Sequence, residues 1–152
     1  MKPFAIFLIL ISLVSCVGKN DPLVVKQYQL RDQVRDNGEE PMIRMEKERR
    51  LRGAISMEER RQRLGQYYTL IWNDAKGVKA GPVELVFEYR QGGTASQIKR
   101  LTKRFPASAA SGVADFSVVG DNYFDNGKVL AWQATVLRDG KEVAVRRSYL
   151  WN

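Results

Sequence analysis

The sequence predicts a mainly β protein: a small antiparallel β-sandwich preceded by a charged, partly helical N-terminal segment. Segments rich in branched and aromatic residues follow one another at short intervals between Gln66 and Trp151, as strands do. Several of them alternate apolar and polar side chains, which is typical of a strand with one buried face. Turn-forming residues separate the segments. A small barrel is the alternative architecture.

One strand is predicted ahead of the charged segment. Residues 23–30 have the sequence LVVKQYQL, in which Val24, Tyr28 and Leu30 share one side of a period-two pattern. The stretch that follows, as far as Pro41, is rich in turn-forming residues and is predicted to be a loop.

The charged segment, residues 43–65, contains one short predicted helix. Ser56 and Glu59 have the spacing of a capping box, in which each side chain bonds to the backbone N–H of the other residue. This predicts a helix from Met57 to Leu64. Before it, Gly53 interrupts any single long helix. No continuous apolar stripe is built there by Met42, Met45, Arg49 and Arg52.

Two explanations compete for the basic residues of this segment. They could bind anionic lipid headgroups, lipopolysaccharide or another acidic polymer. They could instead form a solvated helix face with local Glu–Arg pairs. Acidic residues are interleaved throughout the segment, which weakens any local positive field and favours the solvated face.

Three strands are predicted in the middle of the C-terminal half. Residues 66–72 are rich in aromatic and branched side chains. Residues 83–90 and 113–119 alternate, so that each has one face for the core. The residues predicted to face the core are Val83, Leu85, Phe87 and Tyr89 in one strand and Ala114, Phe116 and Val118 in the other.

Residues 96–105 fit two structures. Ile98, Leu101 and Phe105 have helical spacing, but the stretch lies between predicted strands and Pro106 closes it. An edge strand is favoured, because Lys and Arg side chains discourage pairing between sheet edges. As the densest positive stretch of this half, it also contains the candidate anion-binding residues Lys99, Arg100, Lys103 and Arg104.

The end of the chain predicts a β-hairpin around Asp139-Gly140, a dipeptide that tolerates the positive φ angles of a type I′ turn. Trp132 is the expected core residue of this hairpin. With Arg138 opposite Lys141, the predicted pairs are Val136–Val143, Ala134–Val145, Trp132–Arg147 and Leu130–Tyr149. Short strands separated by turns in this way resemble a sandwich of the immunoglobulin or fibronectin type, without the paired cysteines of true immunoglobulin domains.

The first sixteen residues have the layout of a secretory signal. Lys2 supplies a positive charge, an apolar stretch runs from Phe4 to Leu13, and small Ser15 precedes Cys16. At about 1.5 Å per residue, the apolar stretch is too short to cross a hydrocarbon core of about 30 Å. A cleaved leader is therefore expected rather than a transmembrane helix.

The sequence Leu13-Val14-Ser15-Cys16 resembles the lipobox of bacterial lipoproteins. The resemblance implies that a dedicated signal peptidase recognises the first three residues and cleaves before Cys16, whose thiol and amino group become acylated. Stable anchoring takes at least two acyl chains. In Gram-negative lipoproteins, Asp directly after the acylated cysteine favours retention in the inner membrane. Val17 occupies that position here, which implies passage to the outer membrane. An ordinary secretory signal with a stray thiol at Cys16 is the alternative.

These observations divide the chain into four parts. They are the cleaved signal peptide (1–15), the acylated cysteine and its tether (16–42), the charged segment (43–65) and the sandwich (66–152).

The composition argues against an enzyme. The chain has no histidine, which excludes a Ser–His–Asp triad and histidine-bearing zinc sites. An acylated Cys16 is no nucleophile. Glu84 and Glu88 leave a carboxylate-dependent hydrolase as a remote alternative. We expect no metal or cofactor. Side chains that could supply oxygen ligands to calcium do not have the spacing of an EF-hand loop; they are those of Asp121, Asn122, Asp125 and Asn126.

The net charge of +8 and the pI near 9.8 favour an anionic partner. Export argues against nucleic acid. The expected partners are the membrane, through the lipid on Cys16, and an anionic envelope polymer or an envelope protein. We therefore expect a membrane-anchored envelope lipoprotein whose non-catalytic sandwich has a structural or binding role. A surface module that binds an anionic glycan or lipid is the alternative.

Overall fold

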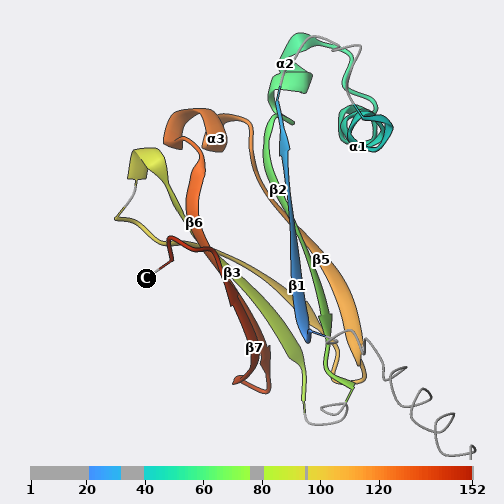
Figure 1. Cartoon of the computed structure of the whole chain (residues 1–152), viewed down its shortest axis with the longest axis vertical. Helices are drawn as coiled ribbons and strands as arrows, with labels where there is room; N and C mark the ends of the chain where they lie inside the picture. Colours follow the sequence, from blue (N-terminus) through green and yellow to red (C-terminus); the bar gives the residue numbers. More distant parts are fainter. Residues whose placement is uncertain (1–20, 32–39, 76–80, 95, 152) are drawn as a thin grey trace, which may run out of the picture.

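The protein is a sandwich of two antiparallel sheets, seen in a computed structural model that describes residues 21–31, 40–75, 81–94 and 96–151 (Figure 1). One sheet has three strands in the order β1-β2-β5, and the other has four in the order β4-β3-β6-β7. The strands are β1 (Leu23–Leu30), β2 (Gly65–Asn73), β3 (Val83–Gln91), β4 (Lys99–Phe105), β5 (Ser111–Val119), β6 (Val129–Arg138) and β7 (Lys141–Arg147).

The strand order confirms the predicted immunoglobulin-like sandwich. The two sheets correspond to strands A, B and E opposite C, F and G of an immunoglobulin constant domain. The remaining strand, β4, pairs with β3 at the edge of the second sheet. The edge strand predicted within residues 96–105 is thereby confirmed. The three-stranded sheet also takes in β1, from the range assigned to the tether, because β1 pairs with β2 along its whole length.

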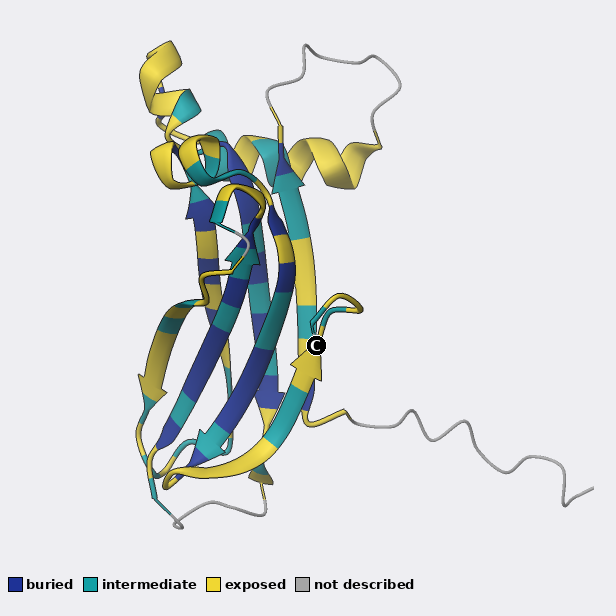
Figure 2. Ribbon diagram, turned by 90° about the vertical axis from the view of Figure 1, so that its left-hand side faces the viewer, coloured by how far each residue is buried: buried dark blue, intermediate teal, exposed yellow. Residues whose placement is uncertain are grey.

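The core lies between the sheets, where the predicted inward faces of β3 and β5 are buried (Figure 2). Phe87 is at its centre, with its ring stacked on Phe116 at 5.6 Å and tilted against Tyr68 at 4.6 Å between centroids. Trp132 packs against this cluster. In β1, Leu23 and Val25 contact the core cluster between the sheets. The predicted side of Val24, Tyr28 and Leu30 is the opposite one, on which Leu30 is also buried.

The C-terminal hairpin forms at the predicted turn, with Asp139 and Gly140 at positive φ, but the predicted register is wrong. Arg138 lies opposite Lys141 as expected. The Leu137–Glu142 pair follows, and a β-bulge after it then adds Val143 to β7, so the pairing slips by one residue. The observed pairs are Val136–Ala144, Thr135–Val145, Ala134–Arg146 and Gln133–Arg147, so Arg147 does not lie opposite Trp132.

Three helices complete the fold. They are α1 (Pro41–Leu51), α2 (Met57–Arg61) and α3 (Asp121–Asn126). The predicted capping box of α2 is present, although α2 ends three residues before the expected Leu64. Helices α1 and α3 were not predicted. A single turn of 3-10 helix, η2 (Gly92–Thr94), follows β3.

The lipobox residues Leu13, Val14, Ser15 and Cys16 lie outside the described residues. Within the described part of the chain, no helix combines the length and the apolar character needed to cross a membrane.

Candidate functional site: the helical end of the sandwich

The two ends of the sandwich differ in structure (Figure 1). Helices α1, α2 and α3 gather at the end where β1 finishes and β2 begins, which we call the helical end. At the opposite end, the base, β1 begins at Leu23 beside the β6–β7 hairpin. The Arg146 guanidinium donates there to the Leu23 carbonyl (3.1 Å) and pairs with Asp21. The described chain therefore enters at the base, and its helices lie at the far end.

Helix α1 lies against the outer face of the three-stranded sheet and buries none of its residues. One side chain, Arg50, makes most of the contact. Its guanidinium stacks 3.8 Å from the centroid of the Tyr67 ring and lies 5.6 Å from that of Tyr28. Its Nε donates to Glu46 Oε1 at 2.7 Å, one turn earlier on the same helix. A nearly buried cation between two tyrosine rings thus fixes the position of α1.

A second arginine holds the C-terminal end of α1. The Arg63 guanidinium donates to the backbone carbonyls of Arg50 and Arg52, which are left without intrahelical partners at a helix end. A positive charge at this position also complements the helix dipole. The Tyr67 hydroxyl donates to the Arg63 carbonyl at 2.6 Å. Both attachments of α1 therefore depend on β2 and the residues just before it.

Helices α2 and α3 are linked by charge. Arg61 Nη1 donates to Asp121 Oδ1 at 2.7 Å, and Gln62 Nε2 donates to the same oxygen at 3.1 Å. These bonds, the Arg61 bond first, lower the pKa of Asp121. The Arg61 guanidinium also lies 4.4 Å from the centroid of the Phe124 ring. The helical end is thus one connected surface rather than three separate helices.

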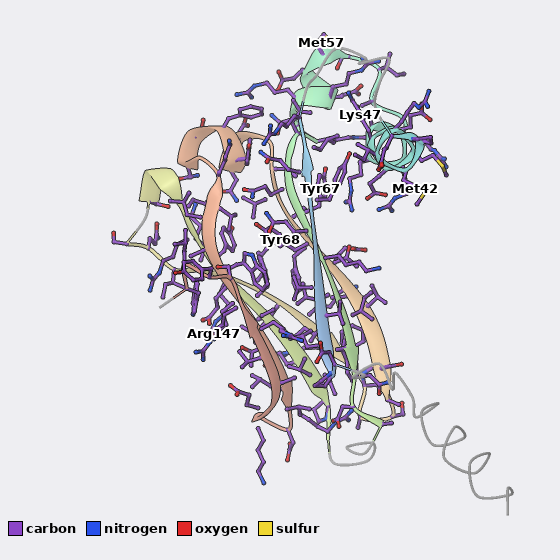
Figure 3. The ribbon with its side chains drawn as sticks, in the orientation of Figure 1. Met42, Lys47, Met57, Tyr67, Tyr68 and Arg147 are labelled. Atoms are coloured by element: carbon purple, nitrogen blue, oxygen red, sulfur yellow. The ribbon has the colours of Figure 1, made fainter. Side chains whose placement is uncertain are left out.

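The outward side of α1 exposes large apolar side chains. Met42 is 74% exposed and Met45 is 65% exposed, and Figure 3 shows Met42 pointing away from the sandwich. Ile55 and Met57, around the start of α2, are exposed as well. Basic residues outnumber acidic residues between positions 40 and 65. The helical end therefore combines exposed methionines with positive charge, and this composition is enriched at protein interfaces.

The four candidate anion-binding residues of β4 do not share a face. Side chains alternate along a strand, so Lys99 and Lys103 point one way and Arg100 and Arg104 the other. Lys99 Nζ donates to Gln91 Oε1 at 2.8 Å and to Asn122 Oδ1 at 3.2 Å. The two arginines pair across the sheet with the acidic residues of β3, Arg100 with Glu88 (2.8 Å) and Arg104 with Glu84 (3.4 Å).

The remaining candidate polar residues have structural partners. Glu84 and Glu88, the possible carboxylate pair, are those of the two cross-strand salt bridges. Asn122 joins Lys99, and Asp121 joins Arg61. Among the described residues, no group of three or more His, Cys, Asp or Glu side chains is arranged to hold a metal ion.

Sequence reasoning missed α1 and with it the outward methionines. The usual sign of a helix is an apolar stripe that it buries, and α1 has none. A usable sign was nevertheless present, because Met42, Met45, Arg49 and Arg52 have the 3-4-3 spacing of one helix face, with Pro41 at the helix start.

Comparison with known proteins gives no relative on which to base a function. No protein-family model matches the chain, no curated protein matches it, and no solved structure matches it.

Proposed function

We propose that the chain is an exported lipoprotein, anchored to the outer membrane by acyl chains on Cys16, whose non-catalytic sandwich holds a binding surface away from the membrane. The order of residues at the N-terminus carries this proposal. A positive start, an apolar stretch and Leu13-Val14-Ser15 end at the chain's single cysteine. In an exported protein a lone thiol invites unwanted pairing, and acylation removes that liability.

The geometry of the sandwich supports the binding role. The chain between Cys16 and Leu23 can span at most about 25 Å, since an extended chain covers about 3.5 Å per residue. An anchor on Cys16 would therefore hold the base near the bilayer. The eight residues of β1 then cover about 26 Å at about 3.3 Å each. The helical end would face away from the membrane and into the compartment that the sandwich occupies.

The proposal is tested by replacing Cys16. A Cys16→Ser variant should lose incorporation of labelled palmitate and move from the membrane fraction to the soluble fraction, because it lacks the acylated thiol. Ser15→Ala, which keeps a small residue before the cysteine, should change neither result. Membrane partition of Cys16→Ser equal to that of the unaltered protein would refute the anchor.

The choice of membrane is tested at the next residue. Val17→Asp should shift the acylated protein from the outer-membrane to the inner-membrane fraction in a density gradient of a Gram-negative host. Val17→Asn is the matched uncharged control and should stay in the outer-membrane fraction. Identical distributions for Val17→Asp and the unaltered protein would contradict the outer-membrane assignment.

A further inference from the structure

We propose that the outward side of α1 binds a groove on a second envelope protein. This surface comprises Met42, Met45 and Arg49 of α1 together with Arg52, which directly follows the helix, and we call it the α1 stripe. The groove would have an apolar floor that receives the two methionines and a carboxylate that pairs with Arg52. The inference rests on the proposed export of the chain, and it names the partner of the helical end.

The spacing of the α1 stripe is that of a helix ligand. Met42, Met45 and Arg49 are three and four positions apart, so they share one side of α1. Arg52 follows three positions later, directly after the last residue of the helix. Helices that dock in grooves place their anchors at this spacing. Met42 and Met45 are among the most exposed apolar side chains of the described residues, so they are available to a partner without any rearrangement of the sandwich.

The attachment of α1 leaves the two methionines of the α1 stripe free. The helix contacts the sheet through Arg50, and Arg63 binds the carbonyls at its C-terminal end. Neither contact involves Met42 or Met45, and Arg63 binds the backbone carbonyl of Arg52 rather than its side chain. A partner could therefore cover the methionines without displacing Arg50 or Arg63. A helix that is already formed and held costs less conformational entropy to bind than a disordered segment.

The charge of the stripe selects an acidic partner. Glu46 already receives two bonds from Arg49, both at 2.8 Å. In the described ranges, by contrast, no carboxylate lies within salt-bridge distance of Arg52. Arg52 is therefore the cation whose partner the groove would supply. Carboxylates at a groove rim pair well with arginine, which offers several donors in a planar fork.

An anionic membrane fits the same surface less well. Interfacial helices carry a broad apolar face of bulky residues with basic residues around it. The α1 stripe has two methionines over three turns and therefore lacks such a face. The base, not the helical end, is the part of the described chain closest to Cys16 in sequence.

The test is photo-crosslinking of the full-length, anchored protein in intact cells. A photoreactive amino acid is placed at Met45 on the α1 stripe and, as a control, at Val113, an exposed apolar position of β5 outside the helical end. We expect one protein adduct from position 45 and none of the same mass from position 113.

Three substitutions then identify the contact. Met42→Asp should lower the adduct yield at least about ten-fold, as loss of a central interface residue does. Arg52→Glu should lower the yield several-fold, whereas Arg44→Glu, the same charge change on another side of α1, should not. Replacing the acidic residue that pairs with Arg52 on the captured protein by lysine should restore the adduct of the Arg52→Glu variant. Unchanged melting temperatures show that the variants remain folded.

Other outcomes overturn the inference. A lipid or lipopolysaccharide adduct would assign the stripe to a membrane, and an adduct with a second copy would assign it to self-association. No adduct, or equal losses for Arg52→Glu and Arg44→Glu, would also refute it. Membrane partition of Cys16→Ser is measured separately, so failure of the anchor and failure of the groove are distinguishable.

Discussion

Arg138 and Asp74 form a nearly buried salt bridge at the base of the sandwich. Arg138 Nε donates to Asp74 Oδ2 at 2.6 Å, and the arginine side chain is only 4% exposed. The same guanidinium donates to the carbonyls of Gly81 (3.0 Å) and Ala109 (2.9 Å). Arg138, the last residue of β6, thereby binds both the β2–β3 connection and the β4–β5 connection. Each of these connections leads from one sheet to the other.

Arg138→Met should destabilise the fold strongly. Removing one partner of a buried ion pair leaves the other charge uncompensated, so we expect the free energy of unfolding to fall by about 3–5 kcal/mol. Urea unfolding measures the change. Arg147→Met, an exposed arginine on the neighbouring strand, is the control and should change stability by no more than about 0.5 kcal/mol. A loss below about 1 kcal/mol for Arg138→Met would contradict the role of this pair.

The stability of the fold should respond differently to removal of the hydroxyl from two adjacent tyrosines of β2. The Tyr68 hydroxyl is buried without a hydrogen-bond partner among the described residues, and burial raises the pKa of this phenol. Tyr67, on the other side of the strand (Figure 3), donates to Arg63. Tyr68→Phe should keep or raise the melting temperature, whereas Tyr67→Phe should cost about 1 kcal/mol. The same loss in both variants would contradict this assignment.

The parts of the fold that the sequence predicts well are those in which a short local pattern decides the geometry. The alternation of Val83, Leu85 and Phe87 follows from a sheet with one buried face, and it is observed. Asp139-Gly140 predicts the hairpin because few other residues tolerate positive φ. The register failed because the extra residue, Val143, carries no local sign of a bulge.

The helical end was less predictable, for a different reason. Helix α1 is held by a guanidinium that contacts tyrosines of β1 and β2, one strand before the helix in the sequence and one after it. Its stability therefore depends on contacts that its own sequence does not contain. Helix α3 is six residues long, too short to show a helical period. Only the capping box of α2, Ser56 with Glu59, is local, and it was found.

Arg50→Ala should loosen α1 and leave the sandwich intact. The substitution removes the stack on Tyr67 and the bond to Glu46, which together stabilise α1 by about 1–2 kcal/mol. Amide exchange in residues 41–51 should become about five- to thirty-fold faster, while exchange in β3 and β6 stays the same. Arg44→Ala, an exposed arginine of the same helix, is the control. Unchanged exchange in α1 after Arg50→Ala would show that another contact holds the helix.

The link between α2 and α3 should depend on pH. The bond from Arg61 lowers the pKa of Asp121 from its ordinary value of 3.8. Because the folded-state pKa is the lower one, the link is complete above pH 3.8 and is lost as the pH falls through the lowered value. Carboxyl-carbon NMR should show the Asp121 pKa below 3.8, and Arg61→Ala should return it toward 3.8. A pKa that Arg61→Ala does not move would contradict the link.

Mass spectrometry of the N-terminal peptide of the mature protein tests the account most directly, because every functional statement depends on an anchor at the base of the sandwich. We predict that the mature chain begins at Cys16 and that this residue carries the mass of a diacylglyceryl group, with or without a third acyl chain. A mature chain that retains the leader, or that begins at another residue with an unmodified thiol at Cys16, would contradict the account.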